Sequence, residues 1–449
     1  MKKNDFIEIE IKDITLDGSG VGRYEGLAVF VPNAVMGDVV KAKILKVKSS
    51  LAYAKIEEIL KKSDKRRDVD CPNASKCGGC SFRHINYSDE LKLKENTVKN
   101  NFKRIAGLEP KFEPIFGGEP DRYRNKAQFP VAMIDGEPQV GFFSNHTHRL
   151  VPCEDCLLQP KEFSYIANVL KDFIKKYNVS VYDETEHKGL IRHLYLRKAV
   201  ETKEIMVCLV INGKELPFCD DFCKMLLEKC NDISSIMLNF NTFDTNVVMG
   251  GKCKTLYGKD HITDILCGVR VKISPLSFYQ VNHFVAEKLY EKAAEYAEVD
   301  GKTVIDLYCG AGTIGLSMAN KAKKIYGVEL VPEAINDAKF NAKENGIDNA
   351  EFFCGDAAFA AKELDEKGIK PDVVIVDPPR KGCDAALINT ICNGFVPERV
   401  VYVSCDSATL ARDSKNFIEN GYEIINAAAF DMFPRTGHVE TVVNFVRKT

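Results

Sequence analysis

Cys405 and Glu440 are the residues whose types and surroundings best suit covalent chemistry. Cys405 follows an apolar stretch, residues 399–404, that we predict to be a strand, and Asp406-Ser407 open a predicted helix after it. In open α/β sheets ligands bind at this end of the strands, and helix amides pointing at the sulfur would lower its pKa and favour a thiolate. A buried structural cysteine is the alternative, and the placement between strand and helix favours the nucleophile.

Glu440 is the candidate partner of this thiolate. A thiolate that adds to carbon 6 of a pyrimidine makes carbon 5 nucleophilic, and a general base must later remove the carbon 5 proton. Apolar residues follow Glu440 in the sequence, so we expect it to be partly buried with a raised pKa. His438 is the competing base.

A glycine-rich turn predicts a nucleotide-like cofactor. Residues 303–307 read as a strand, and Gly310, Gly312 and Gly315 follow with the spacing G-x-G-x-x-G. Such a turn lets the backbone approach a ligand closely. Glu329 ends the next predicted strand, where its carboxylate can accept hydrogen bonds from ribose hydroxyls.

Two further carboxylates distinguish this site from that of a nucleotide dehydrogenase. Asp356 follows the third strand of the unit, where it can contact an adenine, and Asp377-Pro378-Pro379-Arg380 follows the next strand. An acid-Pro-Pro loop at a strand end is typical of class I methyltransferases. Each carboxylate taken alone could be an ordinary polar residue at the end of a strand. Their order along the chain favours a methyl donor site.

Five motifs carry a resemblance to a known family. They are FYQVN at 278–282, DLYCGAGTIGL at 306–316, DPPRKG at 377–382, VYVSCDSATLARD at 401–413 and FDMFPRTGHVET at 430–441. Together they resemble the RNA (uracil-5-)-methyltransferase family, and the stretch at residues 18–40 resembles a TRAM domain. With the cysteine cluster described below, the sequence is most similar to the bacterial 23S ribosomal RNA branch of that family.

The resemblance implies an S-adenosylmethionine-dependent enzyme that methylates carbon 5 of a uridine, flipped out of structured RNA. Ribosomal RNA is the expected substrate and transfer RNA the runner-up. Cys405 would be the nucleophile and Glu440 the base. Ser407 stands where the family often has proline, and Thr313 and Asp356 stand where relatives can carry asparagine. The residues implied around the cofactor are Gln280, Tyr308, Gly310, Gly312, Thr313, Glu329, Asp356 and Asp377.

Cysteines 71, 77 and 80 form a C-x5-C-x2-C run that needs a fourth ligand, and both Cys153 and Cys156 are available. Spacing alone allows a zinc ion or an iron-sulfur cluster. The resemblance implies a 4Fe-4S cluster held by Cys71, Cys77, Cys80 and Cys156. We expect it to serve structure or RNA docking, and residues 82–84 (Phe-Arg-His) to contact RNA.

The element pattern predicts three domains. Residues 1–60, with strands expected at 6–14, 22–30 and 39–47, form a small TRAM-like or oligonucleotide-binding β-barrel. Residues 61–268 form a mixed α+β central domain, with helices at 88–105 (Ser88 as N-cap), 161–177 and 217–230. Residues 269–449 alternate strand and helix, with strands at 303–307, 324–328, 372–376 and 399–404 and a closing hairpin at 422–430 and 439–446. This is the pattern of a doubly wound α/β Rossmann-like methyltransferase domain.

Composition sets outer limits on function. The formal net charge of −2 does not itself indicate a polyanion partner, but residues 61–104 hold twelve Lys or Arg against six Asp or Glu. The sixteen cysteines accompany no signal-like segment, so we expect reduced thiols and a cytoplasmic monomer without a membrane span.

Two other classes remain open at this point. One is a non-catalytic RNA-binding protein, which the intact Cys405, Glu440 and cofactor residues disfavour. The other is a nitrogen methylase, which uses an acid-Pro-Pro loop but needs no cysteine.

Overall fold

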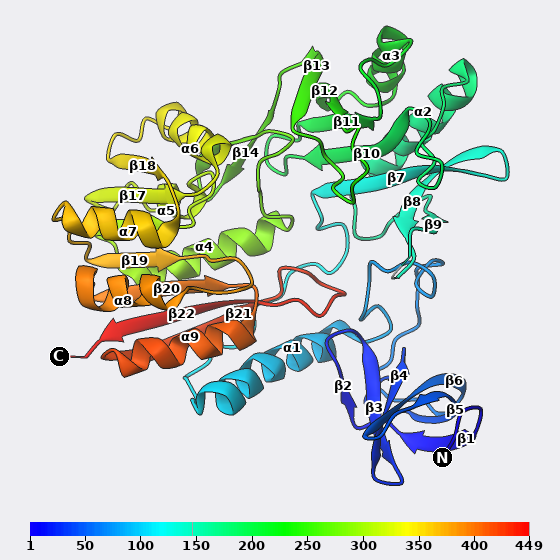
Figure 1. Ribbon diagram of the computed structural model, residues 1–449, viewed down its shortest axis with the longest axis horizontal. Helices are drawn as coiled ribbons and strands as arrows, with labels where there is room; N and C mark the ends of the chain where they lie inside the picture. The colour runs from blue at the N-terminus through cyan, green and yellow to red at the C-terminus, as the bar shows by residue number, and fades with distance from the viewer. Residues whose placement is uncertain (146, 449) are drawn as a thin grey trace.

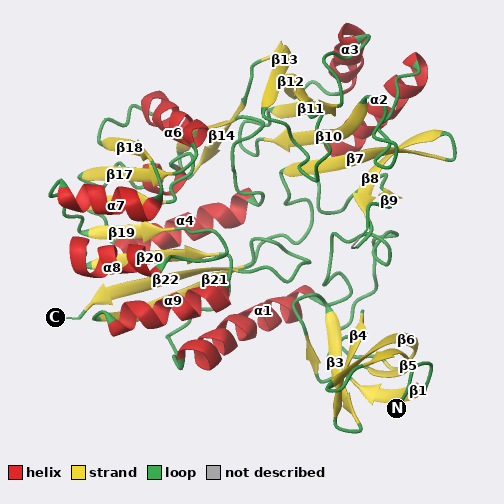
Figure 2. Cartoon of the chain, viewed as in Figure 1, coloured by secondary structure: helices red, strands yellow, loops and turns green. Residues whose placement is uncertain are grey.

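The structure is a computed structural model that describes residues 1–145 and 147–448. In this part of the chain, three large sheets and one short hairpin carry the β structure. Figures 1 and 2 show the three sheets as separate bodies around a middle filled by long loops. The N-terminal sheet and the C-terminal sheet lie towards opposite ends of the long axis, and α1 lies between them.

The N-terminal sheet is a curled barrel of six strands in the order β1-β5-β6-β4-β3-β2, with β1 and β3 in contact. Apolar side chains alternate inward, because successive residues of a strand point to opposite faces. The predicted strand 39–47 is confirmed, strand 22–30 proves to be two strands around the Glu25-Gly26 turn, and the last strand was not predicted. The strands are β1 (Phe6–Glu10), β2 (Asp13–Ile14), β3 (Ser19–Tyr24), β4 (Leu27–Pro32), β5 (Val39–Val47) and β6 (Leu51–Lys61).

The chain passes from the barrel through a cysteine-containing segment (residues 71–80). Helix α1 (Tyr87–Asn101) runs from this segment to the C-terminal sheet, and a π-helical turn η1 (Phe102–Ala106) extends it. The prediction of Ser88 as N-cap is wrong. The helix begins one residue earlier, after Asn86, whose backbone carbonyl accepts the amides of Asp89 and Glu90 at 3.0 Å each. Gly107, at φ +68°, ends the extension.

The central sheet has seven strands in the order β13-β12-β11-β10-β7-β8-β9, and α2 and α3 pack on it around an apolar core. Helix α2 has the predicted bounds, and α3 is shorter than predicted by two residues at its start and one at its end. A hairpin of two strands, β14 and β15, leads to the last domain. The elements are β7 (Lys126–Ile134), β8 (Glu137–Phe143), β9 (Leu150–Pro152), α2 (Lys161–Tyr177), β10 (Ile191–Lys198), β11 (Ile205–Ile211), α3 (Cys219–Lys229), β12 (Ile233–Phe240), β13 (Lys252–Gly258), β14 (Ile262–Leu266) and β15 (Val269–Ile273).

The C-terminal sheet has the order β18-β17-β16-β19-β20-β22-β21, with β22 antiparallel to both of its neighbours. The predicted alternation of strand and helix is confirmed, as is the closing hairpin. The chain leaves β16 for one side of the sheet and returns at β19 on the other, which creates a switch point where ligands bind. The elements are α4 (His283–Ala297), β16 (Thr303–Leu307), α5 (Thr313–Ser317), β17 (Lys324–Glu329), α6 (Pro332–Glu344), β18 (Ala350–Cys354), α7 (Ala357–Glu366), β19 (Val373–Val376), α8 (Ala385–Asn389), η2 (Thr390–Phe395), β20 (Arg399–Ser404), α9 (Ser407–Glu419), β21 (Tyr422–Phe430) and β22 (Glu440–Arg447).

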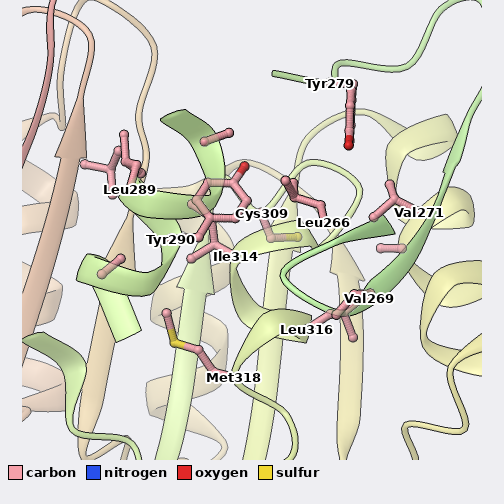
Figure 3. Packing of buried hydrophobic residues seen from close by; sticks show 14 of the residues in the cluster. Leu266, Val269, Val271, Tyr279, Leu289, Tyr290, Cys309, Ile314, Leu316 and Met318 are labelled. Carbon is pink, nitrogen blue, oxygen red and sulfur yellow. The ribbon is translucent and has the colours of Figure 1, made fainter. Parts of the chain in front are cut away.

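Helices cover both faces of this sheet. Val304 packs into the core that includes α4, and the next residue, Ile305, packs into the core that includes α8 and α9. Figure 3 shows the first of these cores, in which Tyr290 of α4 lies with Ile314 of α5 and Val269 of β15. Burial on both faces explains why these strands read as continuous apolar runs in the sequence.

Candidate functional site

One cavity of about 1860 Å³ opens between the three sheets and holds most of the predicted site residues. Its wall includes the β2–β3 turn of the barrel, the cysteine-containing segment, β7 of the central sheet and the switch-point edge of the C-terminal sheet. Gly312 and Thr313 are not among its lining residues. The predicted residues that line it are Cys71, Cys77, Cys80, Cys156, Gln280, Tyr308, Gly310, Glu329, Asp356, Asp377, Cys405 and Glu440.

Neighbouring strands bring Cys405 and Glu440 together. In the register of β20 and β22, Ser404 lies opposite Thr441, so the next step along both chains places Cys405 opposite Glu440. Both line the cavity, and the charge of Glu440 acts on the Cys405 thiol. The last pair of an antiparallel ladder therefore positions the predicted nucleophile beside the predicted base.

The predicted activation of Cys405 by helix amides is wrong. Asp406 caps α9, and its carboxylate accepts the amides of Ala408 and Thr409 at 3.0 Å each, so these amides do not serve the sulfur. Burial, together with the nearby negative charges of Glu440 and Asp377, raises the pKa of Cys405 to about 11. The free enzyme therefore holds a thiol, which must lose its proton before it can attack.

Glu440 is buried at 6% exposure, and it is the first residue of β22. Burial and the negative charge of Asp377 raise its pKa to about 8, in the predicted direction. A carboxylate with such a pKa is suited to accept a proton near neutral pH. His438 also lines the cavity, and burial with the nearby charge of Arg380 lowers its pKa.

Arg380 is a functional residue to which sequence reasoning gave no role. It follows Asp377-Pro-Pro, lines the cavity, and its positive charge lowers the pKa of both Cys405 and Glu440. A guanidinium that favours both anions can stabilise the thiolate before attack. Its place in the acid-Pro-Pro loop was the available signal.

Helix α9 anchors the loop that carries Arg380. Thr409 donates its hydroxyl proton to the Arg380 carbonyl at 3.0 Å, and Asp413 accepts the Cys383 amide at 2.9 Å. Asp413 also accepts the Tyr402 hydroxyl at 2.7 Å. Gly382, at φ +78°, passes so close that a Cβ there would lie 2.3 Å from the Asp413 carboxylate. The loop is thus fixed to the helix that follows the nucleophile.

We expect Asp413→Ala to destabilise the protein by about 2 kcal/mol, because it leaves the Tyr402 hydroxyl without its buried acceptor and the Cys383 amide with the long contact to the Tyr402 hydroxyl at 3.3 Å. Urea unfolding measures this free energy. Asp413→Asn keeps one acceptor oxygen and should lose less. Equal stability of the alanine variant and the wild type would show that Asp413 does not hold the loop.

The pH dependence of turnover follows from the two raised pKa values. The thiolate fraction of Cys405 grows tenfold per pH unit below its pKa of about 11, and Glu440 becomes deprotonated near pH 8. We therefore expect kcat/KM to rise steadily from pH 6 to pH 9. Initial rates across this range measure it, and a flat profile or a fall above pH 7 would contradict the assignment.

The glycine-rich turn places Glu329 next to its backbone. The Glu329 carboxylate accepts the amide of Gly310 at 3.1 Å and the amide of Val331 at 2.9 Å. Gly310 has φ +56°, and a Cβ built on it would meet open space, so the backbone faces the cavity. Asp306, to which sequence reasoning gave no role, is buried outside the cavity lining and accepts the Gly315 amide at 3.0 Å, and burial raises its pKa to about 7.

The remaining cofactor predictions divide into two groups. Asp356 lines the cavity and caps α7, and both helix amides bind its Oδ1, which leaves Oδ2 without a helix amide. Gln280 lines the cavity from the segment before α4. Thr313 instead contacts the Tyr290 hydroxyl at 3.1 Å, on the α4 side of the sheet. A direct cofactor contact by Thr313 therefore has no support in its position.

Five thiols, those of Cys71, Cys77, Cys80, Cys153 and Cys156, line the same cavity, and the cysteines are all free. Cys71 and Cys156 both act on the Cys77 and Cys80 thiols electrostatically, so these sulfurs lie close together. Cys153 lies beside Cys156 and lowers the pKa of the Cys156 thiol. Within the described residues, no three His, Cys, Asp or Glu side chains converge closely enough to hold one metal ion.

The expectation that residues 82–84 contact RNA is wrong. Phe82, Arg83 and His84 are all at least 95% buried, and Arg83 pairs with Asp70 and Asp121 at 2.8 and 2.7 Å. Besides the ion-paired Arg83, the basic residues that line the cavity are Arg124, Lys126, Arg380, Lys381 and Arg412. In the described part of the chain, no helix is long and apolar enough to span a bilayer.

The chain is similar to known RNA methyltransferases over nearly its whole length. The chain is similar to proteins named uncharacterized RNA methyltransferase from Clostridium tetani (42% identical over 99% of this chain and 96% of that protein) and Caldanaerobacter subterraneus (43% identical over 97% and 96%). Its fold is similar to the crystal structure of Pyrococcus abyssi tRNA (uracil-54, C5)-methyltransferase in complex with S-adenosyl-L-homocysteine, with a TM-score of 0.78 and 29% identity over 98% of this chain and 99% of that one.

Two family models match the sequence. The TRAM domain matches residues 2–56, on the barrel, and the tRNA (uracil-5-)-methyltransferase model matches residues 86–448, on the central and C-terminal sheets. The chain therefore belongs to the tRNA (uracil-5-)-methyltransferase family and is an S-adenosylmethionine-dependent RNA methyltransferase with an N-terminal TRAM domain.

Proposed function

We propose that this protein, acting as a monomer, methylates carbon 5 of a uridine in 23S ribosomal RNA through a covalent bond between Cys405 and carbon 6. The placement of Cys405 opposite Glu440 at the end of the β20–β22 ladder carries the proposal. The charge of Arg380 acts on both side chains. Few reactions need a thiol nucleophile and a carboxylate base in one cavity, and methylation of an unactivated pyrimidine carbon is one of them.

The residues act in sequence on the ring. The Cys405 thiol gives its proton to water, the thiolate bonds to carbon 6, and the electrons of the C5=C6 double bond move onto carbon 5 and the adjoining carbonyl. S-adenosylmethionine, when bound, would supply an electrophilic methyl group, which carbon 5 takes as the bond from that methyl to the sulfonium sulfur breaks and leaves a neutral thioether. Glu440 then takes the carbon 5 proton, the electrons of that bond restore C5=C6, and the sulfur–carbon bond breaks to return the Cys405 thiolate.

The residues at the switch point suit such a methyl donor. Glu329, held against the Gly310 amide, offers carboxylate oxygens to ribose hydroxyls, and Oδ2 of Asp356 can accept from an adenine amino group. Leu330, 64% exposed, lines the cavity beside Glu329 and offers an apolar contact to a flat base. Asp377 is half-buried at the foot of the Arg380 loop, between the donor side and the nucleophile, and its partial burial raises its pKa to about 7.

Ribosomal RNA is the favoured substrate because the cavity extends beyond the space for one nucleotide, to two features that the sequence shares with the 23S branch. Its wall continues to Leu16 and Asp17 of the TRAM domain and along the cysteine-containing segment. These two features are the ones by which the sequence resembles the 23S branch. A target base would be flipped into this space from structured RNA, whose flanking strand can follow the basic side chains.

Transfer RNA is the second candidate. The Pyrococcus abyssi protein of similar fold is named for a uridine in transfer RNA, and the likeness covers nearly all of both chains. Mass spectrometric mapping of 5-methyluridine in RNA from cells lacking the protein separates the candidates. We expect loss from 23S ribosomal RNA. Loss from transfer RNA alone would support the second candidate, and no loss from either would overturn both.

We also infer that Cys71, Cys77, Cys80 and Cys156 would hold a 4Fe-4S cluster. Four thiolates are the usual ligands of such a cluster. The charges of Cys71 and Cys156 act on both the Cys77 and Cys80 thiols, so the four sulfurs lie near one another. The buried Arg83 guanidinium acts on both Cys80 and Cys156, so its positive charge can offset that of the bound thiolates. The cluster would link two distant chain segments as a structural group.

We expect anaerobically purified protein to contain about four irons and four sulfides per chain. Cys80→Ser should lose most of this iron, and Cys153→Ser, which removes a thiol outside the implied set, should keep it. Iron and sulfide assays with visible absorption measure both. Stoichiometric zinc in place of iron would contradict the cluster.

A further inference from the structure

The loop that precedes the base, residues 431–439, is held by parts of the chain far away in sequence. It joins β21 to β22 and ends at Glu440. Figure 1 shows it extending from the C-terminal sheet towards α1 and the barrel. Gly437 lies against the Leu16 carbonyl of the barrel, so close that a Cβ there would be 2.0 Å away.

Four charged side chains, each at most 2% exposed, form the main attachment. Lys94 of α1 donates to Glu90 at 2.8 Å, to Asp431 at 2.6 Å and to the Phe433 carbonyl at 3.2 Å. Glu90 accepts the Arg435 backbone amide at 2.7 Å and faces the Arg435 guanidinium at 3.4 Å. The two negative and two positive charges thus neutralise one another. Helix α1 contacts the loop at every second residue from Asp431 to Arg435.

The cysteine-containing segment holds the same loop. The Arg435 carbonyl accepts the amides of Ser81 at 2.8 Å and Phe82 at 3.0 Å, directly after Cys80. Arg435 has φ +69°, a left-handed conformation that its carbonyl and amide contacts must maintain. The Lys94 ammonium also lies 5.8 Å from the centre of the Phe82 ring.

We propose that Glu90 and Lys94 of α1 are positioning residues for proton removal by Glu440, acting through a buried ionic clamp on residues 431–439. The inference rests on the proposed function. Buried ion pairs of this kind fix a geometry rather than add stability, because the cost of desolvation offsets their attraction. The clamp is attached to the loop at Asp431 and Arg435, the segment that leads to Glu440. Cys405 instead directly follows β20, which none of the four clamp residues contacts.

We expect variants that lack the clamp to be slow in one chemical step, the removal of the carbon 5 proton. With Lys94→Met or Glu90→Gln, Cys405 can still add to carbon 6 and carbon 5 can still take the methyl group. Proton removal becomes slow, so the methylated RNA stays bonded to Cys405. We expect a covalent protein–RNA adduct on ordinary uridine RNA, resistant to denaturing electrophoresis, together with a turnover reduced at least tenfold. KM for RNA should change much less.

Several comparisons make the test specific. Lys92→Met removes an exposed lysine of the same helix, which pairs with Asp89 at the surface, and should behave as wild type. Glu90→Gln keeps the volume and acceptor oxygen of the glutamate, so it reports on the clamp where Lys94→Met fails to fold. RNA with 5-fluorouridine blocks proton removal in every variant, and it should trap wild type, Lys94→Met and Glu90→Gln alike.

The outcomes separate the clamp from the proposed function. If wild type forms no adduct with 5-fluorouridine RNA, the proposed function fails. If wild type is trapped and turns over, but the folded clamp variants either keep full turnover or lose it without adduct on ordinary RNA, the clamp proposal is overturned.

Discussion

Cys405→Ala is expected to abolish methyl transfer, with turnover reduced by at least about 10⁴-fold. Without the sulfur no bond to carbon 6 forms, and carbon 5 stays too weak a nucleophile to take a methyl group. The variant should also form no adduct with 5-fluorouridine RNA in the presence of methyl donor. Transfer of labelled methyl groups to RNA and a denaturing gel measure the two effects.

The fold of this variant should be intact, since Cys405 is only partly buried. Its thermal unfolding and its affinity for the methyl donor should match those of wild type. Cys223→Ala, on α3 of the central domain, is the control for loss of a thiol and should keep full turnover. A nitrogen methylase would keep its activity in Cys405→Ala, so survival of turnover would overturn the proposed chemistry.

The sequence predicted the C-terminal sheet well, for a physical reason. Strands buried on both faces appear as short apolar runs, and β16 and β20 were placed at their observed bounds. The barrel was harder, because β6 alternates buried and exposed residues only in its first half and then runs on as an exposed strand. Ser88 was mistaken for a cap because a capping residue is defined by backbone geometry, which composition does not reveal.

The site was predicted as a set of residues, but not as an electrostatic arrangement. That Cys405 and Glu440 lie together depends on the register of two strands that are not adjacent in sequence. The sequence suggested that helix amides would activate the thiol, but Asp406, the adjacent residue, takes those amides itself. A motif therefore identifies the reacting groups, whereas their proton affinities depend on burial and on charges such as that of Arg380.

The clamp on residues 431–439 had no sequence signal at all. Glu90 and Lys94 read as an ordinary i, i+4 surface pair on a charged helix, within a stretch rich in lysine. Only the tertiary fold shows both at 0% exposure, with Asp431 and Arg435 as partners more than 300 residues away. Contacts between such distant residues leave no periodic pattern, so one sequence alone cannot show them.

Glu440→Gln should separate methyl transfer from proton removal. The amide cannot take the carbon 5 proton, so we expect turnover to fall by about 10³-fold, within the usual contribution of a general base. Addition of Cys405 and methyl transfer should remain, so the variant should accumulate a methylated covalent adduct on ordinary uridine RNA, visible on a denaturing gel and absent from Cys405→Ala. His438→Gln is the matched control, since His438 is the other candidate base in the cavity.

Glu440→Gln should also change the stability of the fold, and the raised pKa of Glu440 determines whether the variant gains or loses stability. Burial raises the Glu440 pKa from 4.5 to about 8, so between these values the folded protein keeps a proton that the unfolded chain releases. The Glu440 contribution to stability is therefore present below pH 4.5 and is lost as pH rises towards 8. Glu440→Gln should gain stability relative to wild type over this range in thermal unfolding.

The adduct experiment also tests which residue is the base. If His438→Gln formed the adduct and Glu440→Gln did not, His438 would be the base, because only the group that removes the proton can release Cys405.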